Sequence, residues 1–144
     1  MPGIALLVLG IDQLSKRLVS SHLSLGEPWN PIARLGGLVS LTYVTNTGAA
    51  FGLFPDRSLF FIAIAVIVVI AILIYHRHLP DEALVRASLG LQLGGALGNL
   101  IDRLRYGYVI DFIDFKVWPV FNLADSAIVV GVAVLGYYLL RGRD

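Results

Sequence analysis

Two aspartates, Asp111 and Asp125, carry the chemistry that this sequence could perform. Both lie in apolar surroundings, within Val109-Ile110-Asp111-Phe112 and Leu123-Ala124-Asp125-Ser126, in a chain that is 57% hydrophobic. A carboxylate at membrane depth costs several kcal/mol unless it is paired, hydrated or functional. Two carboxylates that can approach each other are the minimum equipment for general acid–base hydrolysis. The surrounding elements must therefore be able to bring this pair together.

Composition indicates a membrane protein built as a single domain. The hydrophobic fraction of the 144 residues exceeds the roughly 45–50% that is typical of soluble domains. The run Ser58–Tyr75 is uncharged and has apolar side chains on every face. As a helix it would be about 27 Å long, which is enough to cross the hydrocarbon core of a bilayer. This run therefore predicts a transmembrane helix.

Three further segments complete a predicted bundle of four transmembrane helices. We expect helices near residues 3–21, 58–75, 86–103 and 121–140, the last beginning near Pro119 because proline is favoured in a first helical turn. The fold class is thus a mainly α membrane protein, with residues 1–144 as a single integral membrane domain. An even number of spans places both termini on the same side of the membrane.

The remaining chain predicts a small β-containing region outside the membrane. The loop near 22–57 contains Leu38–Thr45, which follows two glycines and is rich in β-branched residues, so it reads as a strand. Trp29 and Trp118 suit the level of the lipid headgroups. Asp111 is expected in the loop between the third and fourth helices, from which it could fold back against Asp125.

Several polar residues within the predicted helices are candidates for supporting the aspartates. Asp12 and Lys16 are spaced i and i+4, and either form a self-neutralising pair that lets a helix enter the membrane or belong to a site. On the third helix, glycines at spacing four (Gly90, Gly94 and Gly98) give a flat face for close helix approach. Asn99 and Arg103 lie on a second stripe, with Asp102 near its end.

Two more segments could act beside the aspartates. Asn122 and Asp125 are i and i+3 on one face near the start of the fourth helix, where the helix dipole favours an ionised carboxylate. Asn46-Thr47-Gly48 combines an amide side chain with small residues that allow a ligand close to the backbone. Taken alone, this second segment is also ordinary turn chemistry.

Five segments together resemble one family, the bacterial lipoprotein signal peptidases, also called type II signal peptidases. They occur in the order and spacing of that family from about residue 4 to 140. The segments are Asp12-Gln13-Leu14-Ser15-Lys16, Asn46-Thr47-Gly48-Ala49-Ala50-Phe51, Gly94-Gly95-Ala96-Leu97-Gly98-Asn99-Leu100-Ile101-Asp102-Arg103, Val109-Ile110-Asp111-Phe112 and Phe121-Asn122-Leu123-Ala124-Asp125-Ser126.

The resemblance implies a four-helix aspartic endopeptidase of the bacterial cytoplasmic (inner) membrane, with both termini cytoplasmic and the active site near the outer face. Its substrates would be prolipoproteins, cut just before a diacylglyceryl-modified cysteine, and it would need no cofactor or metal. It would be a monomer that meets membrane lipid and no nucleic acid. The catalytic residues would be Asp111 and Asp125, the substrate-binding residues Asn46, Asn99, Arg103 and Asn122, and the supporting residues Asp12, Lys16, Gly48 and Asp102.

Other functions were weighed from the residues alone. With no cysteine and no His-Glu-x-x-His segment, thiol chemistry and zinc-peptidase chemistry lack their usual residues. Buried Asp, Lys, Asn and Arg side chains could also form a proton or ion relay, which makes a small transporter subunit an alternative. A non-catalytic assembly factor is a third possibility. Asp114 is interpreted as a solvated or interfacial loop carboxylate outside the catalytic pair.

Orientation in the membrane is not decided by the charge rule. The side that holds the termini carries Arg77, Arg86, Arg141 and Arg143. The other side carries Lys16, Arg17, Arg34, Arg57, Arg103, Arg105 and Lys116. Cytoplasmic loops are normally the richer in lysine and arginine, so a bare count opposes cytoplasmic termini. Several residues of the larger group, however, lie within polar motifs rather than in free loops.

Overall fold

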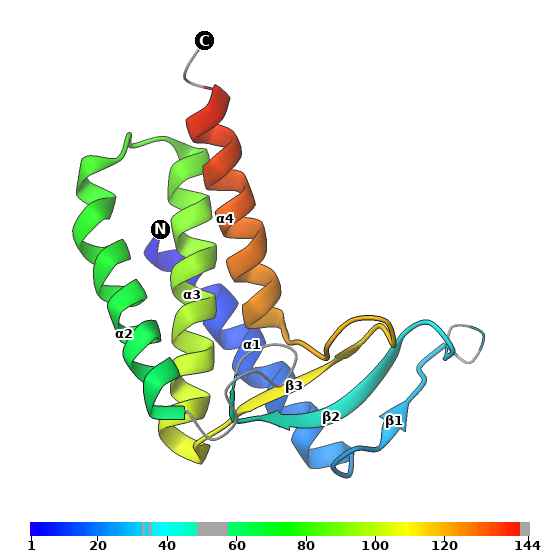
Figure 1. Ribbon diagram of the computed structural model, residues 1–144. Coiled ribbons are helices and arrows are strands. Elements are labelled where there is room, and N and C mark those ends of the chain that lie inside the picture. The colour runs from blue at the N-terminus through cyan, green and yellow to red at the C-terminus, as the bar shows by residue number, and fades with distance from the viewer. Residues whose placement is uncertain (33, 35, 49–57, 142–144) are drawn as a thin grey trace.

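Four helices form a bundle that carries a small antiparallel sheet at one end (Figure 1). The computed structural model describes residues 1–32, 34, 36–48 and 58–141. The helices are α1 (Pro2–His22), α2 (Ser58–Tyr75), α3 (Ala83–Tyr106) and α4 (Leu123–Arg141), and a short 3-10 helix, η3 (His76–His78), follows α2. The predicted four-helix membrane fold with a small β region is therefore confirmed.

Helix α3 lies at the centre of the bundle and packs against each of the other three helices. The predicted glycine face is confirmed, because a Cβ placed on Gly94 would lie 2.6 Å from the Ala5 carbonyl oxygen of α1. A Cβ on Gly95 would overlap the Ala124 carbonyl oxygen of α4. These glycines let three helix backbones approach closely, which brings polar side chains of α1, α3 and α4 within hydrogen-bonding reach.

The outer surface of the bundle is apolar. By length and composition, Ser58–His78 and Leu123–Arg141 are the two described helical segments that could each cross a membrane. Helices α1 and α3 carry more charge, but α1 turns Asp12 and Lys16 inward and exposes leucines outward, among them Leu7, which is 62% exposed. This inside-out distribution suits a lipid environment.

The start of α1 and the last described turn of α4 lie away from the sheet (Figure 1). Met1 packs against a buried cluster that includes Val85 and Leu89, at the start of α3, and Leu135 and Tyr138, near the end of α4, pack against the same cluster. The N-terminus and the last described turn of α4 therefore share one end of the bundle, as an even number of helices predicts.

The sheet has the order β1-β2-β3, formed by β1 (Pro28–Trp29), β2 (Ser40–Asn46) and β3 (Val109–Asp114). The strand predicted at Leu38–Thr45 is confirmed, although it begins two residues later and ends one residue later. The placement of Asp111 in a loop was wrong: it lies in β3 opposite Val44 of β2. The first four residues of β3 are all buried, so this strand lacks the polar–apolar alternation that reveals half-exposed strands.

The start of the fourth helix also differs from the prediction. The chain remains extended after Pro119, and Phe121 pairs with Ile113 of β3 in an isolated bridge. Helix α4 begins only at Leu123, because the Phe121 backbone is occupied by hydrogen bonds to β3. The last residues of the Asn46–Phe51 motif, Ala49–Phe51, lie outside the described residues.

Candidate active site

A reciprocal capping interaction places Asp125 at the start of α4. The Asn122 side-chain oxygen accepts a hydrogen bond from the Asp125 backbone N–H at 2.9 Å. In return, the Asp125 carboxylate accepts one from the Asn122 backbone N–H at 3.3 Å. This is the geometry of a capping box, with Asn122 as the N-cap and Asp125 three residues later. It holds the Asp125 carboxylate at the positive end of the helix dipole.

Asp111 reaches the same region from β3. Its Oδ2 accepts a hydrogen bond from Asn46 Nδ2 at 3.0 Å, and its Oδ1 accepts one from Asn122 Nδ2 at 2.7 Å. The Asn46 amide is oriented by the Gly48 N–H, which donates to its side-chain oxygen. The antiparallel register of β2 and β3 is what brings Asn46 to Asp111.

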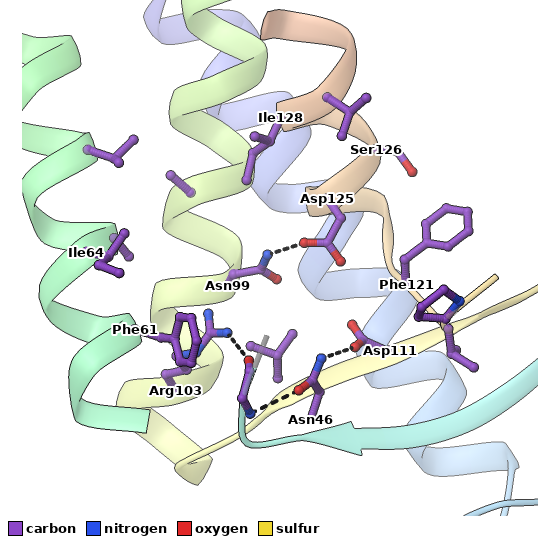
Figure 2. Close-up of a pocket in the computed structure, with 18 of the residues that line it drawn as sticks. Asn46, Phe61, Ile64, Asn99, Arg103, Asp111, Phe121, Asp125, Ser126 and Ile128 are labelled. Atoms are coloured by element: carbon purple, nitrogen blue, oxygen red, sulfur yellow. Dashed lines mark hydrogen bonds between the residues drawn. The ribbon is translucent and has the colours of Figure 1, made fainter. Parts of the chain in front are cut away.

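Two asparagine amides join the carboxylates into one hydrogen-bonded chain. Asn99 Nδ2 donates to Asp125 Oδ1 at 2.7 Å, and Asn122 Nδ2 lies 3.0 Å from Asn99 Oδ1. Since Asn122 also donates to Asp111, the chain runs from one aspartate to the other through two amides. Figure 2 shows Asp111 and Asp125 pointing toward the same space, between β3 and the start of α4.

The surroundings of Asp111 favour its neutral form. Burial and the neighbouring Asp125 carboxylate together raise the pKa of Asp111 to about 7, against the hydrogen bonds from Asn46 and Asn122 that lower it. Two carboxyl groups close together cannot both ionise cheaply, so the pair shares a proton. At neutral pH the site therefore offers one carboxylic acid and one carboxylate.

Both aspartates open onto a pocket of about 810 Å³ between α2, α3, α4 and the sheet. Its polar end is at Asp111, Asp125 and Asn99. The opposite wall is apolar and comes from α2 and α4, including Ile64, Val68 and Ile128 (Figure 2). An elongated substrate with an apolar part would therefore find both a reactive end and an apolar wall.

Arg103 lies at the wall of this pocket. Its Nη2 donates to the Gly48 carbonyl oxygen at 3.2 Å, and its guanidinium lies 5.3 Å from the centre of the Phe61 ring. Within the described part of the chain, its buried Nε has no hydrogen-bond partner. Arg103 thus fastens the segment after β2 to α3 while keeping one donor available.

The supporting residues meet behind the aspartates. Lys16 Nζ lies 2.9 Å from Asp12 Oδ2 and 2.8 Å from Asp102 Oδ2, so the isolated Asp12–Lys16 pair is only half of the arrangement. Gln13, which the sequence analysis did not single out, donates to Asp102 Oδ1 at 2.9 Å and to the Gly98 carbonyl oxygen. Its position between Asp12 and Lys16 in an otherwise apolar helix was the available signal.

Asp114 is not the solvated carboxylate that the sequence suggests. Its side chain is 13% exposed, pairs with Lys116 Nζ at 2.6 Å and accepts a hydrogen bond from Thr42. These contacts hold the pKa of Asp114 below its ordinary value. It therefore ties β3 to β2 and stays ionised, away from the pocket that Asp111 and Asp125 share.

A buried and a half-buried carboxyl group that share one pocket, within a bundle of apolar-faced helices, are what a membrane aspartic peptidase requires. Comparisons with known proteins identify the family. Residues 4–141 match the family model for signal peptidase (SPase) II, Peptidase_A8. The chain therefore belongs to the signal peptidase II family, the lipoprotein signal peptidases.

Individual relatives and a solved structure agree. The lipoprotein signal peptidase of Moorella thermoacetica is 54% identical, covering 98% of this chain and 96% of the relative. That of Halothermothrix orenii is 48% identical, covering 94% and 92%. A bacterial membrane enzyme solved by the in meso method is 31% identical with a TM-score of 0.87, covering 98% of this chain and 87% of that one.

The family membership settles the activity at the level of the reaction. The chain is an aspartic endopeptidase of a bacterial membrane that removes signal peptides from lipid-modified prolipoproteins. The ion-relay and assembly-factor alternatives are therefore wrong. Which residues carry the reaction, and how the bundle is oriented, follow from the geometry as proposals.

Proposed function

We propose that Asp111 and Asp125 are the catalytic pair of this signal peptidase. The observation that carries the proposal is that both side chains line one pocket and are joined through the amides of Asn99 and Asn122. The pair combines a carboxyl group whose pKa is about 7 with a second one at a helix N-terminus. These are the properties required of a general acid and a general base.

The roles of the two aspartates follow from their surroundings. Asp125, at the positive end of α4, is the ionised member that takes a proton from a water molecule. The water then attacks the carbonyl carbon of the scissile peptide bond. Asp111, the protonated member, hydrogen-bonds the carbonyl oxygen as negative charge develops there. Asp111 then gives its proton to the leaving amine as the bond breaks. The pair keeps the proton that Asp125 took from water, so it again holds one proton.

Asn46, Asn99 and Arg103 are our candidates for contacts to the substrate, since all three line the pocket. The Arg103 guanidinium, which carries several N–H donors at the pocket wall, is the group suited to a backbone carbonyl of the bound peptide. The fourth residue that the sequence assigns to substrate binding, Asn122, is 0% exposed and its amide is used by Asp111 and Asn99. That assignment needs correction: Asn122 orients the aspartates from behind.

The apolar wall of the pocket suits the lipid-modified part of the substrate. Ile64, Val68 and Val129 lie on α2 and α4, the two most apolar helices. A diacylglyceryl group on the cysteine after the cleavage site would place its chains along this wall, while the peptide bond before the cysteine lies at the aspartates. Buried apolar area of this kind stabilises a bound lipid by about 0.8 kcal/mol per CH₂.

The remaining predicted residues support the pair. The Gly48 backbone N–H fixes the Asn46 amide, and its carbonyl oxygen receives Arg103. Asp12, Lys16 and Asp102 form the buried ionic cluster behind the aspartates. We expect the whole chain to act as a single integral membrane domain and as a monomer.

The bundle would sit in the cytoplasmic membrane with both termini in the cytoplasm and the sheet at the outer face. Lys16 is buried and Arg103 lines the pocket, so neither belongs to a loop outside the membrane. The charge rule counts loop residues, so the larger group of basic residues loses these two. The two sides then differ little, so the charge rule no longer opposes this orientation. Trp29 and Trp118 are both more than half exposed and suit the outer headgroup level.

A cleavage assay tests the function. Purified full-length protein in detergent is incubated with a lipidated precursor peptide and, separately, with the same peptide lacking the lipid. We expect release of the signal peptide only from the lipidated precursor in the wild type, and from neither in Asp111→Asn or Asp125→Asn. Normal turnover in either variant would refute the catalytic pair.

The orientation is tested by labelling. The chain contains no cysteine, so single cysteines introduced at Ser24, before the sheet, and at His78, the last residue of η3, report on opposite ends of the bundle. In intact spheroplasts, a membrane-impermeant maleimide should label the first site and not the second. The reverse pattern would place the termini outside.

A further inference from the structure

Behind the catalytic pair lies a buried ionic cluster formed by Asp12 and Lys16 of α1 and Asp102 of α3. All three side chains are at most 2% exposed. Burying three charges is expensive, and apolar side chains of similar shape would often stabilise a fold equally well. The cluster is therefore more than the fold itself requires, and its hydrogen bonds show what else it does.

Each carboxylate of the cluster holds the backbone next to one of the catalytic aspartates. Asp12 Oδ1 accepts a hydrogen bond from the Ala124 N–H at 3.0 Å, and Ala124 immediately precedes Asp125. Asp102 Oδ2 accepts one from the Ile110 N–H at 3.2 Å, and Ile110 immediately precedes Asp111. The two catalytic residues come from different elements, α4 and β3, and the same cluster fastens both.

Lys16 joins the two carboxylates and adds a third contact. Its ammonium group lies within 3.0 Å of Asp12, Asp102 and Asn99 Oδ1, which accounts for its three hydrogens. Because an ammonium group only donates, it holds the oxygen of Asn99 toward itself. The amide nitrogen of Asn99 must then face Asp125, as observed.

We infer that Asp12, Lys16 and Asp102 form a positioning unit that sets the spacing of the two catalytic carboxylates. Asp12 positions Asp125 through the Ala124 N–H, and Asp102 positions Asp111 through the Ile110 N–H. Lys16 fixes the Asp12 and Asp102 carboxylates relative to each other. None of the three lines the pocket that would receive the substrate, so they act through the aspartates and through Asn99. This inference rests on the proposed catalytic pair and deepens it.

The test separates positioning from a role in stability through two double variants. The wild-type cluster has two carboxylates and one ammonium group, a formal sum of −1. Both Asp12→Asn with Lys16→Met and Asp12→Leu with Lys16→Met keep a sum of −1, since only Asp102 remains charged. Asparagine and leucine have similar shapes, but only asparagine retains an oxygen that can accept the Ala124 N–H.

The leucine variant leaves the buried Ala124 N–H without an acceptor, so it should unfold at a somewhat lower temperature than the asparagine variant. Below both unfolding temperatures, the two variants should bind the lipidated precursor with similar KM. The leucine variant should have a kcat about 100-fold below that of the asparagine variant, the loss typical of a displacement of about 1 Å at a reacting group. Equal kcat values in the two folded variants would overturn the inference, because charge balance alone would then explain the cluster.

Amide hydrogen exchange gives a second test should the leucine variant fail to fold. A neutral amide oxygen accepts a weaker hydrogen bond than a carboxylate does, so Asp12→Asn keeps the bond but should accelerate exchange at Ala124 and not at Ile110, and Asp102→Asn should do the reverse. Identical patterns in the two variants would overturn the inference. Asp111→Asn, assayed in parallel, separates the failures, since turnover there would refute the catalytic pair itself rather than its positioning.

Discussion

The pKa of Asp111 can be moved by one neutral hydrogen bond, and this gives a quantitative prediction. Asn46→Leu removes the Nδ2 donor that lies 3.0 Å from Asp111 Oδ2 while keeping a side chain of similar shape. That donor stabilises the ionised form, so its hydrogen bond lowers the pKa of Asp111 from what burial alone would give. Its loss must therefore raise the pKa above about 7.

The size of the shift follows from the difference between two hydrogen bonds. A bond to a charged group contributes about 1.5–3 kcal/mol and one to a neutral group about 0.5–1.5 kcal/mol, a difference of about 1 kcal/mol. At about 1.4 kcal/mol for each pKa unit, the expected shift is about 0.7 units. Asn46 is partly exposed, so this is an upper estimate.

The assay is the pH dependence of kcat/KM for a lipidated precursor between about pH 5 and 9, which reports the pKa of groups in the free enzyme. Asp111 acts in its protonated form, so activity is lost as the pH rises through its pKa. The wild type should lose activity near pH 7, and Asn46→Leu should lose it at higher pH, whatever the change in absolute rate.

Thr42→Val is the matched control. Thr42 lies on the same strand but donates to Asp114 rather than to Asp111, so this variant should leave the alkaline limb where it is in the wild type. An unchanged or lowered pKa in Asn46→Leu would refute the reasoning, as would an equal shift in both variants.

Two further predictions concern packing and substrate binding. Gly95→Ala should lower the thermal unfolding midpoint, at a cost of about 1–3 kcal/mol in stability, because the new Cβ would overlap the Ala124 carbonyl oxygen. Gly136→Ala is the control: a Cβ there meets nothing within 4 Å, so this variant should be neutral or stabilising. Equal midpoints in the two variants would contradict the close approach of α3 and α4. Arg103→Lys should raise KM about tenfold with a smaller change in kcat. Lysine cannot both contact the Gly48 carbonyl oxygen and stack on Phe61 as the guanidinium does. Steady-state cleavage measures both constants, and an unchanged KM would exclude Arg103 from the substrate contacts.

The helices and the candidate catalytic residues could be predicted from the sequence, because each leaves a local signal in it. The uncharged run Ser58–Tyr75 is helix α2 with the predicted bounds. The glycines at spacing four in α3 predict the close helix packing. The motif order also identified the family. Asp111 and Asp125 stood out because carboxylates are costly in so apolar a chain.

What escaped the sequence depends on contacts between distant backbone groups. The first four residues of β3 are all buried, so Val109–Phe112 shows no strand periodicity in its sequence. The hydrogen bonds from Ala124 and Ile110 to the ionic cluster use main-chain N–H groups. Every residue except proline carries such a group, so the sequence gives no sign of which ones are used. Asn122 was correctly placed beside Asp125, but only the fold shows that it is fully buried and faces the aspartates.

The central claim is that Asp111 and Asp125 together perform the cleavage, and three isosteric variants test it in one experiment. Single-turnover cleavage of a lipidated precursor is measured for Asp111→Asn, Asp125→Asn and Asp114→Asn, each checked for wild-type thermal stability. The first two should lose at least about 10³-fold in rate, the scale of general acid–base catalysis, while Asp114→Asn, whose carboxylate serves the sheet, stays within about tenfold of wild type. Cleavage near the wild-type rate in either of the first two variants, or equal losses in all three, would contradict the account.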